Sequence, residues 1–288
     1  MTPFRALCGF KPLPAIAHHL STTPELSALI PPAIVDAFIA VAASPSPTGP
    51  EEKAALKDLF AALMTAKEDS IKEQLAILVA RYTGSDGELE SVVLRVNSQF
   101  PDDIGVFCVF LLNYVKLEPG EAIFLGAGEP HAYISGGKFI LSAVRQADSY
   151  VSLDIIECMA NSDNVIRAGL TPKLRDVPNL VGGLTYVSAD PSRHHVQPTP
   201  FAPASTLYDP PIPEFSVVQV KLAGGEEQHR AVDGPSLVVV THGKGRVSWE
   251  EGSLELREGD VFFIGADTPV RFACQDALVM YRAFVEDN

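Results

Sequence analysis

The sequence predicts a mainly β protein with a helical domain, and three observations support this prediction. Apolar residues recur at i, i+3 and i+4 spacing over residues 33–43 and 52–82, which indicates helices. After residue 100 the chain changes to short apolar runs broken by Gly, Pro and Asp, which indicates antiparallel strands. Residues 117–133 recur in altered form at 256–272, so we expect two copies of one β-barrel or jelly-roll domain.

The composition restricts the kinds of partner that the protein can bind. The chain has 288 residues, 47% of them hydrophobic, which suits about two domains with substantial cores. Acidic residues outnumber basic ones 36 to 22, which excludes a broad surface for nucleic acid or anionic membranes. The longest apolar stretch, residues 104–115, is shorter than the roughly 20 residues of a membrane-spanning helix. We therefore expect a small-molecule partner. A cytoplasmic location is expected because residues 1–10 lack the charged leader and apolar run of a secretory signal, and the protein is expected to be a monomer.

The helical part extends from about residue 12 to residue 99, and residues typical of helix starts and ends support this interpretation. A Ser-, Pro- and Gly-rich segment at 44–50 separates two helical patterns, Glu51 and Glu52 place negative charge in the next first turn, and Gly-rich residues 84–87 follow. The four cysteines are widely spaced and are expected to be buried free thiols. The expected strands lie at residues 106–115, 122–125, 216–222, 236–241 and 261–264.

The internal repeat separates a copy that can bind metal from one that cannot. Six of the 17 aligned positions are identical, at an offset of 139 residues, and both copies have a Gly-acidic pair at the entry turn of a strand. His131 in the first copy is matched by Val270 in the second. Only the first copy can therefore bind a metal ion at this position.

The segment that contains His131 resembles the second motif of the cupin superfamily. Its pattern, Pro-Gly-acidic-x4-Gly-x4-His, starts at Pro119 and ends at His131. In that superfamily the histidine points into the barrel as a metal ligand. The resemblance implies cupin barrels and a metal-binding role for His131.

Longer motifs are similar to type I mannose-6-phosphate isomerases. They are Glu-Pro-His-Ala-Tyr-Ile-Ser-Gly at 129–136, the run at 157–173 that ends in Arg-Ala-Gly-Leu-Thr-Pro-Lys, and Asp-Val-Pro-Asn-Leu at 176–180. The resemblance also covers residues 2–10, the helical part, and residues 208–215. It implies a zinc enzyme, with one zinc per chain, that interconverts mannose 6-phosphate and fructose 6-phosphate and so serves GDP-mannose supply.

The same resemblance implies roles for five residues. His131 is the implied zinc ligand, Tyr133 a pocket residue and Glu157 an acidic group of the active site. Arg167 and Lys173 are the implied basic pair, with Arg167 in the catalytic set and both binding substrate. A dianionic phosphate needs charge-assisted donors, and a guanidinium can give two parallel hydrogen bonds.

Two departures from the family pattern are visible. The family's other zinc ligands, a Gln-x-His pair and a Glu, lie before the stretch that here begins at Thr2, so the resemblance implies an N-terminally truncated homologue with an incomplete first barrel. We expect this chain as written to show negligible isomerase activity. Residues 137–153 are an atypical insertion; the hypothesis is a retained intron, because Gly137-Lys138 can be encoded by GGT-AAG, and a surface loop is the alternative.

The expected organisation has three parts: a helical domain with an N-terminal remnant of the catalytic domain (1–100), a first, catalytic cupin region (101–187) and a second, metal-free cupin (188–288). A non-catalytic cupin that binds a sugar phosphate is the alternative function, and an iron-dependent cupin oxygenase is a third class. Solvated or capping roles are expected for the other histidines, His18, His19, His194, His195, His229 and His242.

Overall fold

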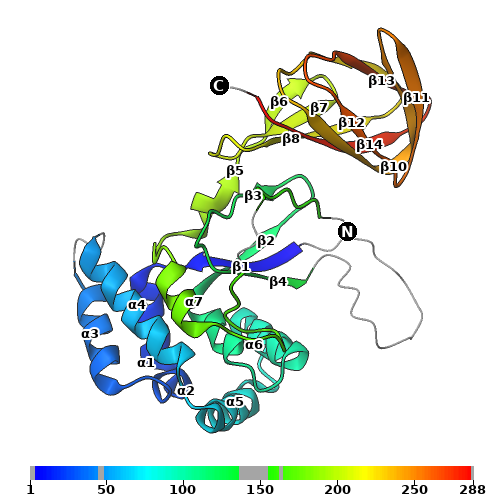
Figure 1. Ribbon diagram of the computed structural model, residues 1–288. Helices are drawn as coiled ribbons and strands as arrows, with labels where there is room; N and C mark the ends of the chain where they lie inside the picture. The colour runs from blue at the N-terminus through cyan, green and yellow to red at the C-terminus, as the bar shows by residue number, and fades with distance from the viewer. Residues whose placement is uncertain (1–3, 45–48, 136–154, 162–164, 287–288) are drawn as a thin grey trace. The chain divides into compact units, whose positions relative to one another are not determined.

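The computed structural model describes residues 4–44, 49–135, 155–161 and 165–286, which fold as two compact units (Figure 1). The first unit comprises the described residues within 1–118, 125–153 and 164–194, and the second those within 119–124, 154–163 and 195–288. The helical part, the β-rich remainder and the jelly-roll-like second unit confirm the predicted fold class. The boundaries expected after residues 100 and 187 stay a prediction.

The α-helices of the described chain all lie in the first unit. They are α1 (Leu13–Thr22), α2 (Pro24–Ser27), α3 (Pro32–Ala42), α4 (Pro50–Met64), α5 (Glu68–Tyr82), α6 (Glu88–Gln99) and α7 (Val177–Gly183). Helix α3 confirms the pattern at 33–43, whereas the pattern at 52–82 is divided between α4 and α5. At the start of α4, the Gly49 N–H donates to the Glu52 carboxylate over 2.6 Å, which satisfies one of the free N–H groups of the first turn.

The helices pack on a strand through aromatic side chains. Phe10, at the end of β1 (Phe4–Phe10), is fully buried and lies edge-on to Phe60 of α4 at 5.5 Å between ring centroids. The same ring stacks on Tyr186 at 5.6 Å. A buried carboxylate, Glu25 of α2, accepts two hydrogen bonds from Arg81 of α5, at 2.8 and 2.7 Å. This core fixes β1 relative to the helices.

The sheet of the first unit has three antiparallel strands in the order β2-β1-β4, with β2 at Leu112–Leu117 and β4 at His131–Ser135. The strand expected over 106–115 is wrong in its first half. Residues Ile104–Phe110 form the 3-10 helix η1, whose first turn is capped by the Asp103 carboxylate, 2.6 Å from the Gly105 nitrogen. All seven residues of η1 are buried, and a short, fully buried apolar run does not distinguish a strand from a helix.

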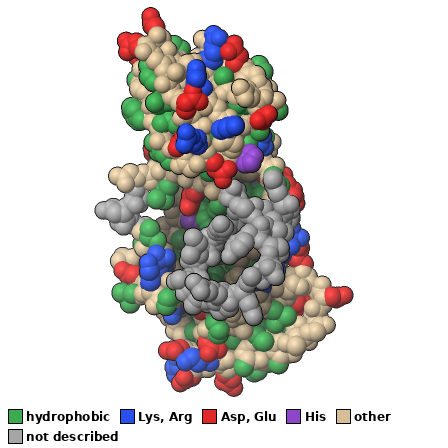
Figure 2. Space-filling view, turned by 90° about the vertical axis from the view of Figure 1, so that its right-hand side faces the viewer, with side chains coloured by type: hydrophobic (Ala, Val, Ile, Leu, Met, Phe, Trp, Pro, Cys, Tyr) green, Lys and Arg blue, Asp and Glu red, His purple; other side chains and the backbone are tan. Residues whose placement is uncertain are grey.

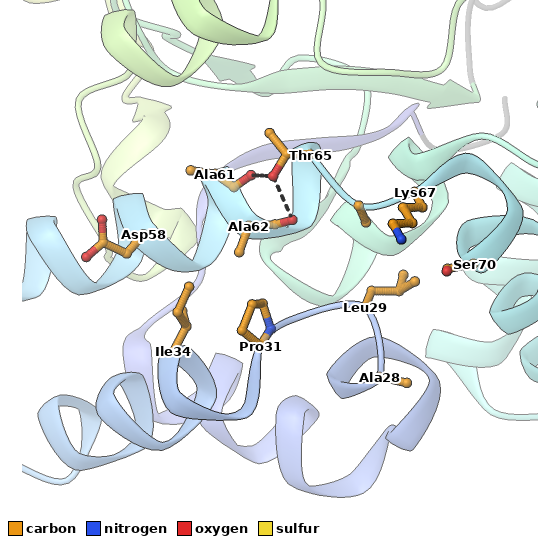
Figure 3. A pocket seen from close by; sticks show the side chains of 11 residues that line it. Ala28, Leu29, Pro31, Ile34, Asp58, Ala61, Ala62, Thr65, Lys67 and Ser70 are labelled. Atoms are coloured by element: carbon orange, nitrogen blue, oxygen red, sulfur yellow. Dashed lines mark hydrogen bonds between the residues drawn. The ribbon is translucent and has the colours of Figure 1, made fainter.

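An open hollow lies between α3, α4 and the start of α5 (Figure 3). Its lining is mainly aliphatic, and the Thr65 hydroxyl donates to the carbonyls of Ala61 and Ala62 at 2.8 and 3.2 Å. None of the residues that the sequence assigns to a site lines this hollow.

The second unit is a curled antiparallel sheet in the order β6-β7-β8-β14-β10-β13-β9, with β11 and β12 also pairing β10. Strands β6 and β9, at the two ends of this order, contact each other, so the barrel is nearly closed. The strands are β6 (Thr199–Ala202), β7 (Ser205–Tyr208), β8 (Ser216–Leu222), β9 (Gly225–His229), β10 (Ser236–Trp249), β11 (Gly252–Arg257), β12 (Val261–Ile264), β13 (Val270–Cys274) and β14 (Leu278–Phe284). A separate pair, β3 (Ala122–Ile123) with β5 (His195–Val196), belongs to the same unit.

The sequence repeat corresponds to a repeat of structure. Gly120 and Gly259, at matching positions in the two entry turns, both have positive φ, at 98° and 90°. This conformation favours glycine because it has no Cβ. His131 begins β4, and its counterpart Val270 begins β13. Both copies therefore place the same turn and the same following strand.

The buried polar groups differ from expectation at two histidines. His194 and His229 are 3% and 1% exposed, so the solvated role expected for them is wrong, and His229 lies in a strand, where it caps no helix. Two of the four cysteines, Cys8 and Cys108, are buried as expected, and burial raises the pKa of their thiols to about 11 and about 12.

The surface charges are mixed. On the face drawn in Figure 2, acidic and basic side chains are interspersed, and no single basic patch gathers there. Ion pairs such as Arg246–Glu255 and Arg271–Glu226 join the two signs on the second unit. Within the described ranges, no helix combines the length and the apolar character that crossing a bilayer requires.

Candidate functional site

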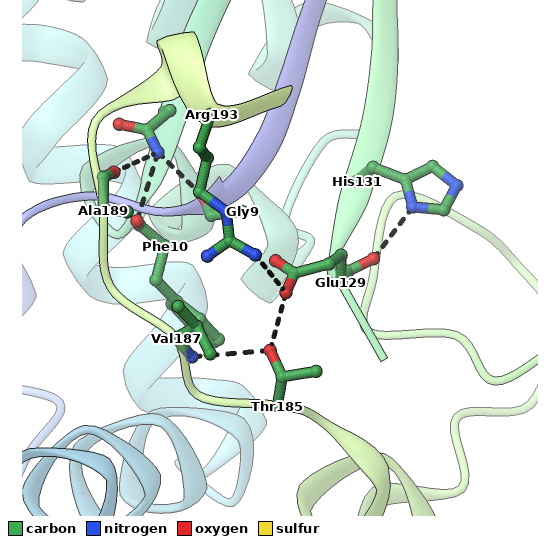
Figure 4. Close-up of polar contacts among 9 residues, drawn as sticks. Gly9, Phe10, Glu129, His131, Thr185, Val187, Ala189 and Arg193 are labelled. Carbon is green, nitrogen blue, oxygen red and sulfur yellow. Dashed lines mark hydrogen bonds and ion pairs between the residues drawn. The ribbon is translucent and has the colours of Figure 1, made fainter. Parts of the chain in front are cut away.

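His131 begins strand β4 and pairs with Cys8 of β1 in the sheet register. Its side chain is exposed, and its Nδ1 lies 2.9 Å from the backbone oxygen of Glu129 (Figure 4). A carbonyl oxygen only accepts, so Nδ1 carries the proton and donates it. In the neutral ring, Nε2 then carries a lone pair, and metal-binding histidines are commonly fixed in this way by a backbone carbonyl.

The turn before His131 is held by a buried carboxylate. Oε1 of Glu129 accepts from the Thr185 hydroxyl at 2.8 Å and from the Arg193 guanidinium at 3.0 Å (Figure 4). The Glu129 side chain is only 4% exposed. Backbone hydrogen bonds add to this, from Thr185 to Gly128 and from Gly9 to Pro130, at 3.1 and 2.9 Å. Three distant segments thus fix the carbonyl that orients the His131 ring.

Removal of the Glu129 carboxylate is expected to destabilise the first unit. In Glu129→Ala, Arg193 and Thr185 lose their partner, and breaking a buried pair costs about 3 kcal/mol, the lower end of the usual range because Arg193 keeps contact with water. Urea unfolding followed by far-ultraviolet circular dichroism measures this, because the described α-helices are in this unit. Glu68→Ala, which breaks an exposed pair with Lys72 in α5, is the control and should leave the midpoint nearly unchanged. Equal midpoints for both variants would contradict the buried-anchor interpretation.

Tyr133 lies two residues after His131 on the same strand, so both side chains lie on the same face. The two ring centroids are 6.1 Å apart. Phe4 of β1 meets the Tyr133 ring edge-on at 5.2 Å. The structure thus brings together two of the residues that the sequence assigns to the site.

Arg167 and Lys173 flank a segment that is pinned to the start of η1. The Leu170 N–H donates to the Asp103 carboxylate over 2.9 Å, and the same oxygen accepts from Gly105. Gly169 lies so close to Gly105 that an added Cβ would be 2.9 Å from its backbone, so this crossing requires glycine. Sequence reasoning missed Asp103, although an acidic residue just before a helical turn is a recognisable capping signal. It also missed the role of Glu129 and, with it, Thr185 and Arg193, for which no local pattern exists.

The two cations at the ends of this segment differ in exposure. Arg167 is half-buried and Lys173 is exposed. Glu157 is exposed and belongs to the part of the chain assigned to the second unit. The insertion at residues 137–153 lies outside the described residues, so the intron and loop hypotheses both stay untested.

Zinc fits His131 as one ligand, since its ring is oriented by the Glu129 carbonyl and Nε2 is available. In the part of the chain that the structure describes, no three His, Cys, Asp or Glu side chains come together as a metal-binding group. Zinc sites use three or four protein ligands. The described residues thus fit a single ligand and not a complete zinc site.

Comparisons with known proteins identify the family to which the helical part and the second unit are similar. The model of the helical insertion domain of type I phosphomannose isomerase matches residues 29–112, and the model of the C-terminal domain of the same family matches residues 205–249. Mannose-6-phosphate isomerase of Cryptococcus neoformans is 43% identical over 310 aligned residues, which cover 99% of this chain and 68% of that protein. The enzyme of Saccharomyces cerevisiae is 40% identical, with 100% and 67% covered.

Solved structures give the same result. A crystal structure of mannose 6-phosphate isomerase from Salmonella typhimurium, bound to substrate and a zinc atom, superposes with a TM-score of 0.75 at 28% identity and covers 99% of this chain. The chain spans 64% of the length of that structure, somewhat less than two thirds. The matches to both family models and the high identity to fungal relatives over nearly the whole chain show that it belongs to the type I mannose-6-phosphate isomerase family.

Proposed function

We propose that this protein acts in the zinc-dependent interconversion of mannose 6-phosphate and fructose 6-phosphate, with His131 as a zinc ligand. The observation that carries the proposal is the fixed ring of His131 within a family of mannose-6-phosphate isomerases, because its Nδ1 is committed to the Glu129 carbonyl and its Nε2 is left to bind metal. A cytoplasmic location and a monomeric state, expected from the sequence, remain part of this proposal.

The other site residues have distinct roles in the proposal. Arg167 and Lys173 bind the phosphate, since both are cations at the ends of one anchored segment. Tyr133 forms a wall of the pocket next to His131, and Glu157 is the acidic group available to move a proton between C1 and C2 of the sugar. When bound, zinc supplies a Lewis acid that polarises the oxygens of the substrate.

An isomerase assay combined with metal analysis tests the proposal, and it decides between this function and the negligible activity that the sequence predicts for the chain as written. The purified protein should interconvert the two hexose phosphates and contain one zinc per chain, and a chelator should abolish turnover until zinc is restored. The alternative, a non-catalytic protein that binds a sugar phosphate, is favoured by the presence of only one fitting ligand among the described residues. Binding of mannose 6-phosphate without zinc and without turnover would establish that alternative and reject the enzyme.

A further inference from the structure

The carboxylate of Asp103 joins two parts of the first unit that are far apart in the sequence. Its Oδ1 accepts from the Gly105 N–H over 2.6 Å, which caps η1, and from the Leu170 N–H over 2.9 Å. The first bond is local, whereas the second bridges 67 residues. A bond of the first kind is sufficient to cap a helical turn. The second bond therefore serves the segment that contains Leu170.

Leu170 has a backbone conformation that a leucine does not favour by itself. Its φ is +55°, in the left-handed region, where residues with a Cβ other than Asn and Asp are uncommon. Such a conformation persists only where the surrounding structure holds it. The Asp103 carboxylate accepts from the N–H of this same residue, and the Leu170 side chain packs against the buried core. These contacts hold Leu170 in the left-handed region.

The crossing leaves no room for the segment to move closer to η1. A Cβ added at Gly169 would lie 2.6 Å from Oδ1 of Asp103 and 2.9 Å from the Gly105 backbone. A Cβ added at Gly105 would lie 2.7 Å from Cγ of Leu170. The absence of both Cβ atoms allows the close approach that the Asp103 hydrogen bonds require. Because η1 is part of the hydrophobic core, the segment is attached to the interior of the unit.

The attachment point lies midway between the two cations of the segment. Leu170 follows Arg167 by three residues and precedes Lys173 by three. The Lys173 N–H also donates locally to the Thr171 hydroxyl, over 3.2 Å. Binding groups that are held in place beforehand bind more tightly, since ordering them on binding costs free energy. Each cation is close to a fixed point of the backbone, and loss of that point would increase the freedom of both.

We propose that Asp103 is a positioning residue that sets the affinity of the site for the phosphate of the substrate. In this role it does not touch the substrate. It holds Leu170, and through the backbone Arg167 and Lys173, in the arrangement that receives the phosphate. The inference rests on the proposed function, in which these two cations bind the phosphate. It adds that an acidic residue, which would repel a phosphate on direct contact, is required for phosphate binding.

Equilibrium dialysis of the complete protein against labelled hexose 6-phosphate tests the proposal, and the sum of both isomers is measured so that turnover does not affect the result. Asp103→Ala should weaken binding roughly tenfold, because a displacement of about 1 Å in a site can cost as much as 100-fold in its function. Charge alone predicts the opposite sign, since removal of a negative charge favours an anionic ligand. Asp103→Asn keeps an oxygen that can accept from both N–H groups and should restore most of the affinity.

Asp176 provides the matched control. Its carboxylate accepts from the Asn179 N–H over 3.2 Å and caps α7, as Asp103 caps η1. It lies three residues after Lys173. Asp176→Ala therefore removes a cap and a negative charge from the same part of the chain but keeps the bond to Leu170. This variant should bind hexose 6-phosphate at least as tightly as wild type does.

Two further measurements separate positioning from a general loss of structure. Addition of Asp103→Ala to Arg167→Ala should weaken binding clearly less than Asp103→Ala does alone, because the position of a missing guanidinium no longer matters. Trypsin, applied briefly without ligand, should cut after Arg167 several times faster in Asp103→Ala than in wild type or Asp176→Ala. Local opening of the segment exposes it to the protease, so this rate reports the attachment without any binding or activity.

The outcomes distinguish failure of this proposal from failure of the proposed function. If Arg167→Ala weakens binding and Asp103→Ala does not, the positioning role is rejected and the proposed function stands. If Arg167→Ala binds as wild type does, the phosphate role in the proposed function is rejected, and the positioning role with it. Equal losses in Asp103→Ala and Asp176→Ala also reject the positioning role. If Asp103→Ala does not fold, Gly169→Ala decides, because its Cβ displaces the segment while the carboxylate is kept; unchanged binding by that variant rejects the proposal.

Discussion

Replacement of His131 by alanine should remove zinc from the protein and abolish isomerase turnover. The reason is that Nε2 of this residue is the proposed metal-binding atom, while Nδ1 is committed to the Glu129 carbonyl. Loss of a group that only supports a ligand typically costs 10- to 100-fold in metal affinity, so loss of the ligand itself should cost more than about 100-fold. Zinc per chain, measured by elemental analysis after dialysis, gives a readout that does not depend on activity.

The control for this experiment is another exposed histidine. His242 on β10 has a side chain that is 68% exposed and lies 3.5 Å from Glu258, so His242→Ala removes an imidazole without affecting the proposed site. This variant should keep its zinc and its activity. Retention of both by His131→Ala would show that the repeat assigned the metal to the wrong residue.

Local pattern predicted much of the second unit correctly. Residues 216–222 and 261–264 were expected to be strands and form β8 and β12 with those bounds. These runs are short, rich in β-branched and aromatic residues, and bounded by turns, so local preference and tertiary context agree. The same turn signals make the internal repeat recognisable in the sequence alone.

Local pattern could not predict which polar side chains are buried, because their burial depends on residues distant in the sequence. His229 lies inside the barrel because Ser205, 24 residues away, and Glu227 supply its hydrogen bonds, at 3.0 and 3.1 Å. Arg282 occupies one of the alternating positions of β14 whose side chains are buried inside the barrel. From sequence alone, an arginine at such a position is expected to point into solvent. The strand register decides between these interpretations, and the register depends on the other strands.

The candidate site likewise contains residues that a local motif predicts and residues that only the fold brings together. The sequence motif identified His131 and Tyr133, and the structure brings them together because they are two residues apart on one strand. The Glu129 anchor depends on Thr185 and Arg193, which follow it by 56 and 64 residues. Chain folding, and not spacing, assembles such a support.

Replacement of Arg167 by alanine should impair recognition of the substrate's phosphate. Arg167 is half-buried at the start of a segment that Asp103 holds in place, so in the proposed site its guanidinium would meet the phosphate from a fixed backbone. Loss of one partner of a hydrogen-bonded charge pair costs a few kcal/mol, so kcat/KM for mannose 6-phosphate should fall roughly 100-fold or more. Arg167→Lys keeps the charge but not the paired donors, so its kcat/KM should lie between that of wild type and that of Arg167→Ala.

The discriminating measurement is the preference for phosphorylated over unphosphorylated mannose. Wild type should strongly prefer mannose 6-phosphate, and Arg167→Ala should lose most of this preference, because only the phosphorylated sugar loses an interaction. Arg246→Ala removes a cation from an exposed ion pair with Glu255 and should retain the wild-type preference. Circular dichroism establishes that each variant is folded. A folded Arg167→Ala that discriminates as well as wild type would mean that Arg167 is an ordinary solvated charge, and that the phosphate is recognised by other residues.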